Sequence, residues 1–150
     1  MAVFHYSLQS ILDIKIKMEN QAKQEFGAAR SALSMEQEIL EEFCHRKEFY
    51  EQNAAQLLTG ALRVREIEEN QNAILHMEQN IRMQRERVRA AEEKVEAARE
   101  HLAEIARDIK THEALKEKAF EEYILEENRA ESKAVDELTS YTYGKRKAGE

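Results

Sequence analysis

A seven-residue repeat of branched apolar residues runs through the second half of the chain. It fills seven consecutive positions of one phase: Ile67, Ile74, Ile81, Val88, Val95, Leu102 and Ile109. Such a repeat keeps one side of an α-helix apolar, and that side has to pack on another helix. The companion positions, three residues later, are mixed: Asn70, Met77, Gln84, Ala91, Ala98, Ile105 and His112. The spacing predicts a coiled coil in which Ala91 and Ala98 allow close approach and Asn70 and Gln84 fix the register.

The composition also favours long helices. The 150 residues include no Pro and only four Gly, while 35% of them are charged. A compact domain of this length would need several tight turns, and tight turns draw on Pro and Gly for their backbone angles. The sequence therefore predicts an all-α fold made of a few long, solvated helices.

The first half of the chain has its own alternation of three and four residues. It comprises Phe26, Ala29, Leu33, Glu36, Leu40, Phe43, Lys47, Tyr50, Ala54, Leu57, Ala61 and Val64. Earlier members of the pattern are Phe4, Leu8, Ile11, Met18 and Ala22, with Lys15 as an exception. Two successive steps of four after Met18 predict a stutter, with local unwinding near Gly27. A complete break at Gly27 is the less favoured alternative, because an isolated Gly costs a helix only about 1 kcal/mol.

The two patterns meet at residues 58–62, which contain Thr59 and Gly60. Gly60 can end a helix in a left-handed conformation, and Thr59 or a neighbour can cap the start of the next helix. The sequence therefore predicts a long antiparallel two-helix coiled-coil hairpin, with a single unbroken helix as the alternative. We expect one domain over residues 1–150, with helices at about 4–57 and 63–142, a turn at about 58–62 and a basic tail at 143–150.

A hinge near Gly60 makes the two arms unequal and places Phe4 opposite the neighbourhood of Lys116. Residues from about 118 to 143 should then form a C-terminal helical overhang without an intramolecular partner. A lone helix in water cannot bury an apolar stripe, so we expect another molecule to cover it. Self-association, or folding back onto the hairpin, is the alternative. The stripe consists of Phe120, Tyr123, Ile124, Ala130, Ala134, Leu138 and Tyr141.

Charge and hydropathy exclude several classes of protein. The formal charge of -7 disfavours binding to nucleic acid or adhesion to a membrane through a basic face. No apolar run approaches the roughly 18 residues of a membrane span. One cysteine, Cys44, cannot form an internal disulfide, which fits a reducing compartment. We therefore expect a cytoplasmic protein that does not insert into a membrane.

The sequence contains no recognisable catalytic or metal-binding set. His112 and Glu113 begin like a zinc-protease helix motif, but Lys116 stands where the second His is required. Cys44 and His45 are adjacent, so on a helix their side chains point about 100° apart. We predict no enzymatic activity, no metal and no cofactor.

Both ends of the chain resemble the FliJ family of flagellar export proteins. Phe4, Tyr6, Leu8 and Leu12 resemble the family's opening of two aromatic residues and spaced leucines. Ser132 and Ala134 depart from the family, where longer polar residues are common. The resemblance of the closing segment rests on Leu115, Lys116, Glu117, Lys118, Tyr123, Arg129, Lys133, Asp136 and Glu137, followed by a short basic tail.

This resemblance implies a central stalk and general chaperone of the flagellar type III export apparatus. Its partners would be the hexameric export ATPase, into which the stalk inserts, the cytoplasmic linker of the export gate protein, and substrate chaperones. The chain would then lie on the cytoplasmic face of the flagellar basal body. Another rotary-ATPase stalk is an alternative, as is a prefoldin-like hairpin chaperone, although the strands expected of a prefoldin are not evident.

Two sets of residues are the expected contacts of this stalk. The ATPase is expected to contact the overhang at Phe120, Tyr123, Ile124, Asp136 and Glu137. Phe49 and Tyr50 are adjacent and cannot both face the seam, so one of them should remain outside. The export gate is expected to dock there, although ordinary seam packing is the alternative for this patch, which comprises Ile39, Phe43, Phe49, Tyr50, Ala73 and Met77.

Overall fold

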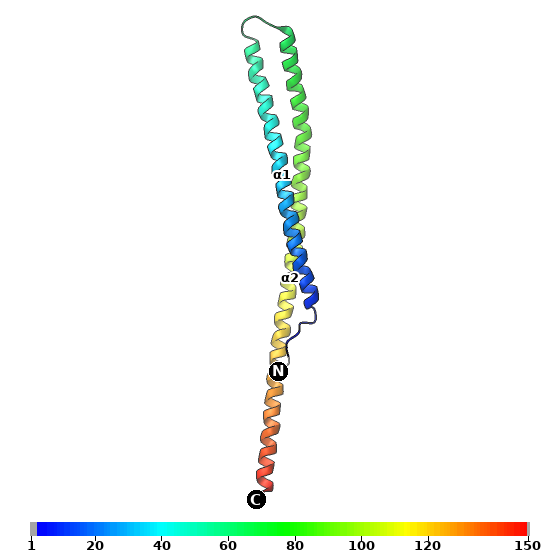
Figure 1. Cartoon of the computed structure of the whole chain (residues 1–150), viewed down its shortest axis with the longest axis vertical. Coiled ribbons are helices and arrows are strands. Elements are labelled where there is room, and N and C mark those ends of the chain that lie inside the picture. Colours follow the sequence, from blue (N-terminus) through cyan, green and yellow to red (C-terminus); the bar gives the residue numbers. More distant parts are fainter. Residues whose placement is uncertain (1–2, 150) are drawn as a thin grey trace. The chain divides into compact units, whose positions relative to one another are not determined.

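Two long helices make up nearly all of the structure, a computed structural model that describes residues 3–149. Helix α1 spans Gln9–Leu57 and helix α2 spans Val64–Ala148. They run antiparallel and are joined by one turn (Figure 1). No strand occurs in residues 3–149. The two helices pack against each other as a helical hairpin, which confirms the predicted fold class.

The chain divides into two compact units, each of which contains a section of both helices. The hinge unit is Glu19–Glu104, and the terminal unit combines Met1–Met18 with Ile105–Glu150. The organisation of residues 1–150 as one domain stays a prediction.

The seam of α2 follows the predicted repeat. All fourteen predicted seam positions of this helix are buried or half-buried. Within the hinge unit the buried apolar members are Met77, Ile81, Val88, Ala91 and Val95, and within the terminal unit they are Ile105 and Ile109.

Two polar side chains are buried within the seam of the hinge unit, at Asn70 and Gln84. The Asn70 amide donates to the carbonyl of Tyr50 at 3.0 Å and accepts from Asn53 at 3.1 Å. The Gln84 amide donates to the backbone carbonyl of Glu36 at 2.9 Å and also to the Glu36 carboxylate. Because any other register would separate these partners, the two layers fix the pairing of the helices, as predicted.

The N-terminal part of α1 packs in a phase that differs from the prediction. Leu12 is 3% exposed, whereas Ile11 and Met18 are 43% and 41% exposed. Counting back from Phe26, the steps of four and three continue without a slip through Ala22, Glu19, Lys15 and Leu12, none of which is exposed. The predicted stutter is therefore wrong. The alternative of a break at Gly27 is also wrong, because α1 continues through it.

Charged residues at two seam positions explain this error. Lys15 is half-buried, and its Nζ lies 3.0 Å from Asp108 of α2. Glu19 lies 3.3 Å from Lys23, one turn along α1. Long charged side chains can lay their stems along a seam while their charged ends reach water or a partner. The apolar pattern therefore placed Ile11 and Met18 in the seam, although both face outward.

The turn is built around Gly60, which has a φ of 84°. This left-handed conformation confirms the predicted role of Gly60, since residues with a Cβ rarely adopt it. The Thr59 hydroxyl donates to the carbonyl of Gln56 at 2.7 Å. Thr59 therefore caps the end of α1 and not the start of α2.

Both outer helix ends differ from the predicted bounds. Helix α1 begins at Gln9 and not near residue 4, and residues 3–8 form no helix. Phe4 and Tyr6, which alternate along this non-helical segment, both approach α2. Helix α2 continues to Ala148, so residues 143–148 of the predicted basic tail are helical, and Lys145, Arg146 and Lys147 lie in its last turn. Positive charge there is favourable for the helix dipole.

The corrected phase predicts different costs for two adjacent substitutions. Leu12→Ala should lower the free energy of unfolding by about 2 kcal/mol, because it removes a buried side chain. Ile11→Ala should cost less than about 1 kcal/mol, since Ile11 lies outside the seam. Urea unfolding followed by circular dichroism at 222 nm measures both. Equal losses of unfolding free energy, or a larger loss for Ile11→Ala, would support the seam phase that was predicted from sequence.

The two internal glycines should respond to alanine with opposite signs. Gly60→Ala should destabilise the chain by about 1 kcal/mol, because a Cβ strains the left-handed backbone. Gly27→Ala should stabilise it by about 0.5–1 kcal/mol, because alanine is the better helix former. A Cβ at Gly27 meets no atom within 4 Å. Thermal melts compare the melting temperature of each variant with that of the parent chain. A lower melting temperature for Gly27→Ala would argue against an unbroken α1.

Candidate functional site

An aromatic cluster in the terminal unit marks the limit of intramolecular packing. The ring centroid of Phe4 lies 5.2 Å from that of Phe120 and 5.4 Å from that of Tyr123. Phe4 therefore lies opposite a point about one helical turn beyond Lys116. The prediction that Phe120 and Tyr123 lack an intramolecular partner is wrong. Residues 3–8 are not helical and so reach farther per residue than a helix does.

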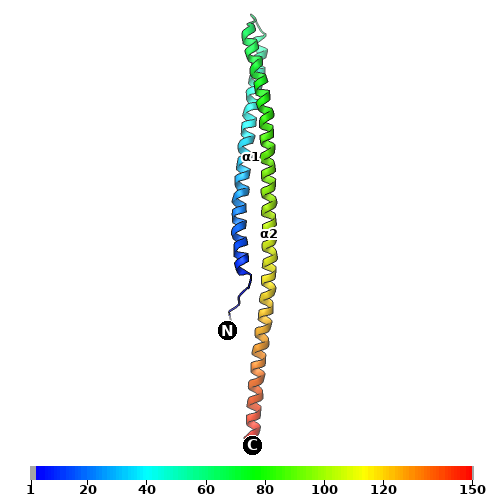
Figure 2. The same ribbon diagram turned by 90° about the vertical axis from the view of Figure 1, so that its right-hand side faces the viewer.

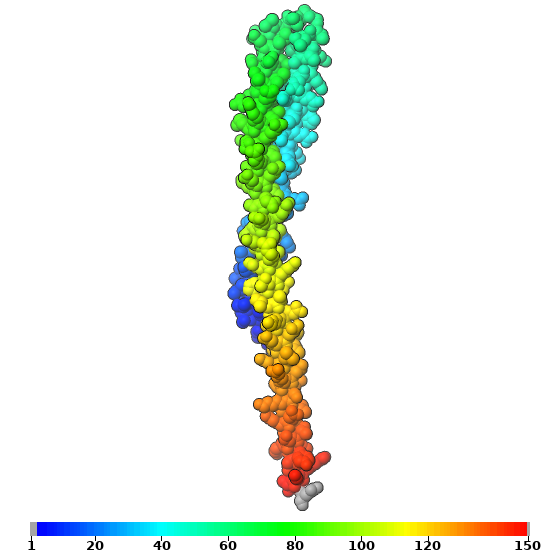
Figure 3. Space-filling view, turned by 180° about the vertical axis from the view of Figure 1, so that it is seen from behind, coloured from blue at the N-terminus to red at the C-terminus, as the bar shows by residue number. Residues whose placement is uncertain are grey.

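Beyond residue 127, none of the described residues of the terminal unit covers α2. Every residue from 128 to 149 is exposed, and no other described segment of the terminal unit lies beside this end of α2 (Figures 2 and 3). The seam phase also ends here, because its next positions are Glu126, Ala130, Lys133 and Glu137. We call residues 128–148 the overhang. It continues α2 and does not fold back, and it is roughly 30 Å long at 1.5 Å per residue.

Large apolar side chains lie on more than one side of the overhang. Val135, Leu138, Tyr141 and Tyr143 are 60–68% exposed. At 100° per residue, they spread over roughly 200° of the helix circumference. An amphipathic helix that packs on one neighbour needs a stripe only about 100° wide. The overhang is therefore suited to contact on several sides.

The predicted ATPase contacts do not form one surface. Tyr123 is half-buried beside Phe4, whereas Phe120 and Ile124 remain 45% and 40% exposed. Asp136 and Glu137 are exposed, and helical geometry places them outside the apolar arc of the overhang. The structure thus separates an aromatic group near residue 120 from a carboxylate pair farther along α2.

The predicted gate patch divides between the seam and one flank of the hinge unit. Met77 is buried, and Phe43 and Tyr50 occupy half-buried seam positions. Phe49 is 64% exposed, so the expectation that one of the two adjacent aromatics stays outside is confirmed. Ile39 and Ala73 are half-buried at equivalent positions beside the seam, one on each helix. In an antiparallel pair such positions lie on the same side, which Phe49 also faces.

Sequence reasoning missed an apolar flank in the terminal unit. Ile11, Ile14 and Met18 are all more than 40% exposed, and their spacing of three and four places them on one side of α1. The prediction had assigned Ile11 and Met18 to the seam. Following the phase of Phe26 back to Leu12 would have identified this flank.

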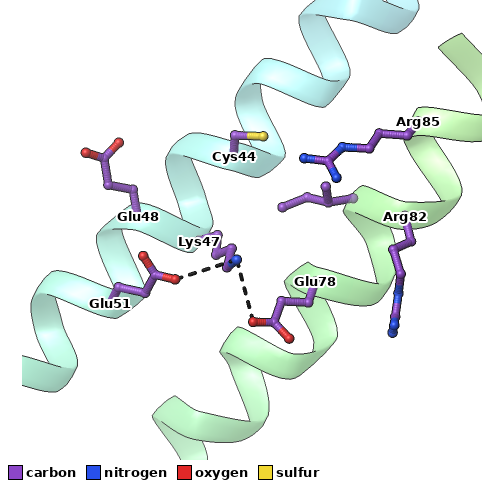
Figure 4. Close-up of a pocket in the computed structure, with 8 residues that line it drawn as sticks. Cys44, Lys47, Glu48, Glu51, Glu78, Arg82 and Arg85 are labelled. Atoms are coloured by element: carbon purple, nitrogen blue, oxygen red, sulfur yellow. Dashed lines mark ion pairs between the residues drawn. The ribbon is translucent and has the colours of Figure 1, made fainter.

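A hollow of about 580 Å³ lies between the helices of the hinge unit (Figure 4). Lys47 Nζ lies 3.5 Å from Glu78 and 3.7 Å from Glu51. Six of the eight lining residues are charged, whereas pockets for small molecules are mostly apolar. The described residues contain no group of three or more His, Cys, Asp or Glu side chains that could hold a metal ion.

Comparison with known proteins identifies the family. Residues 4–148 match the family described as Flagellar FliJ protein. The chain belongs to the FliJ family. The Flagellar FliJ protein of Bacillus subtilis (strain 168) is 25% identical to this FliJ-family chain over 136 residues, which cover 91% of this chain and 92% of that protein.

A solved structure shares the fold of this FliJ-family chain. It is described as a YscO homolog, CT670, from Chlamydia trachomatis, and it superposes with a TM-score of 0.83 at 22% identity. The match covers 99% of this chain and 100% of the other. At this identity, the likeness shows the fold alone.

Family membership places the chain among flagellar FliJ-type proteins. These are structural or chaperone-like export components and not a known enzyme family. In the part of the chain that the structure describes, no helix is long and apolar enough to cross a membrane.

The aromatic cluster yields a prediction about the N-terminal segment. Phe4→Ala should speed amide hydrogen exchange in residues 3–8 and lower the free energy of unfolding by about 1 kcal/mol, because the ring contacts with Phe120 and Tyr123 are lost. Val3→Ala is the control, since Val3 is 76% exposed. Exchange followed by mass spectrometry should distinguish the two variants. Identical exchange in both would mean that Phe4 does not hold the segment on α2.

Proposed function

We propose that this FliJ-family chain is the central stalk of the flagellar type III export ATPase. In this proposal, the overhang enters the hexameric ATPase and promotes its assembly and turnover. The hinge unit contacts the export gate, and the chain also serves as a general chaperone that escorts substrate chaperones. The observation that carries the proposal is the wholly exposed helical overhang with its wide apolar arc.

The width of the apolar arc favours a partner that surrounds the helix. Fully burying a side chain the size of Val, Leu or Phe contributes about 1.5–3 kcal/mol of free energy. A partner that buries Val135, Leu138, Tyr141 and Tyr143 would therefore gain several kcal/mol of binding free energy. A groove on one protein covers one side of a helix. The channel of a ring covers several sides at once, which matches an arc of roughly 200°.

The predicted ATPase contacts take separate parts in this proposal. Phe120 and Ile124 supply apolar surface beside the segment that precedes the start of α1 at Gln9. Tyr123, held beside Phe4, joins the N-terminal segment to the same surface. Asp136 and Glu137 face cationic groups of the ring from the more polar side of the overhang.

The gate contact is proposed for the flank formed by Ile39, Phe49 and Ala73. Met35 and Met83 are 64% and 58% exposed, and their heptad positions place them on the same flank. Together they extend the apolar surface along the hinge unit. Phe43, Tyr50 and Met77 support this flank from the seam beneath it.

Charged substitutions in the overhang test the proposal. Val135→Glu with Leu138→Glu should raise the Kd for the ATPase at least tenfold and abolish its stimulation, because the arc can no longer be buried. The fold should remain intact, since both side chains are exposed. ATP hydrolysis by the purified ATPase is measured as the chain is titrated in.

A matched control is available in the hinge unit. Leu58 and Leu75 are 65% and 55% exposed, so Leu58→Glu with Leu75→Glu changes the same chemistry away from the overhang. It should leave ATPase stimulation unchanged. If both double variants stimulate like the parent chain, the overhang does not enter the ATPase. Unchanged stimulation by Asp136→Lys with Glu137→Lys would remove only the carboxylate pair from the contact.

A further inference from the structure

Charge is segregated along the end of α2. Residues 117–137 hold eight carboxylates against three cations, a net charge of about -5. Residues 138–144 hold no charged side chain, in a chain of which 35% is charged. The helix then ends in three consecutive cations, Lys145, Arg146 and Lys147. The end of α2 therefore has an acidic section, an uncharged section with a Leu and two Tyr, and a basic end.

The basic end is available to a partner. Lys145, Arg146 and Lys147 are exposed, and none of them forms an ion pair among the described residues. Lys145 Nζ lies 6.0 Å from the ring centroid of Tyr141, and Lys147 Nζ lies 5.7 Å from that of Tyr143. The helix dipole contributes only about half a negative charge at this terminus. Glu150 adds one negative charge in the sequence, so residues 145–150 carry a net charge of +2 before the dipole is counted, and a positive excess is left.

The acidic and basic sections are far enough apart to be sensed separately. Glu137 and Lys145 are eight residues apart, or about 12 Å along the helix axis. The Debye length at physiological ionic strength is about 8 Å. A surface of one sign would attract one section and repel the other. A complementary partner must therefore change sign along the helix.

We infer that the channel that receives the overhang carries a collar of carboxylates around Lys145, Arg146 and Lys147. About 12 Å away, next to Asp136 and Glu137, the same channel carries cationic groups. Leu138, Tyr141 and Tyr143 contact an uncharged wall between the two. This inference rests on the proposed function and goes beyond it, because the change of sign sets the direction and the depth of insertion.

A protein collar suits the basic end better than a polyanion does. Nucleic acid lying along the helix would meet the acidic section, with its net charge of about -5, next to the cations. Protein segments that recognise anionic lipid usually cluster about four to eight cations, and this end has three. Both anions nevertheless serve as controls in the test.

The test measures binding of the full chain to the purified, hexameric export ATPase of the same organism. Lys145→Gln with Arg146→Gln and Lys147→Gln should raise the Kd about threefold, and reversal of all three to Glu should raise it about tenfold or more. The matched control is Arg82→Glu with Arg85→Glu and Arg87→Glu. These three arginines are also exposed and form no ion pair with any residue from 3 to 149, and reversal of all three changes the net charge as much as reversal of the tail cations does. The control should bind within about twofold of the parent chain.

Each outcome decides the inference. Unchanged binding by both tail variants overturns the collar and leaves the proposed function intact. Equal weakening by the control variant also overturns it, because net charge alone would then explain the loss. A parent chain that does not bind the ATPase overturns the collar and the proposed function together.

Two further measurements exclude fraying of the helix end and binding to a polyanion as explanations. Circular dichroism checks that α2 is intact. The Gln variant is the control for fraying, because Gln, unlike Glu, adds no negative charge at the C-terminal end of the helix. Phosphatidylglycerol vesicles and a single-stranded RNA serve as probes for polyanions. If the tail variants lose binding to either probe while ATPase binding is unchanged, the collar is overturned.

Discussion

The apolar seam between two helices is the contact on which the whole structure depends. A helix with one neighbour can bury only one strip of its surface, and no described side chain is more than 98% buried. An apolar strip alone tolerates sliding by a heptad. The polar layers at Asn70 and Gln84 therefore matter more here than in a globular core, because they make one pairing better than its neighbours. Gly60 then sets where the pairing begins.

The parts of the fold that follow from local pattern could be predicted, and the parts set by charge or by distant contacts could not. The heptads of α2 are regular enough to specify its buried side, and a lone Gly beside Thr59 identifies the turn. The seam of the N-terminal part of α1 could not be found from its apolar residues, because Lys15 and Glu19 hold seam positions that apolar residues usually fill. The start of α1 depends on Phe4 and Tyr6 reaching α2 more than 100 residues away.

The candidate site, too, could be predicted where local pattern decides and not where distant contacts do. The unequal lengths of the two arms predicted that part of α2 would lack a partner, and the structure shows such a segment. It begins farther along α2 than predicted, because Phe4 packs on Phe120 and Tyr123. The apolar flank at Ile11, Ile14 and Met18 was missed for the same reason that the phase was wrong. In the gate patch, the heptad phase already assigned Met77 and Tyr50 to the seam, but only the structure shows that Phe49 is the aromatic residue that stays outside.

The uncovered end of α2 also bears on how long the molecule survives in a cell. Helical segments without tertiary contacts open at little cost in free energy, and proteases cut chains where they open. Residues 128–148 include Arg129, Lys133 and the cations of the last turn, which are cleavage points for trypsin-like enzymes. A bound partner would shield these peptide bonds. The supply of partner would then regulate the intact amount of this protein, and an excess would be trimmed away.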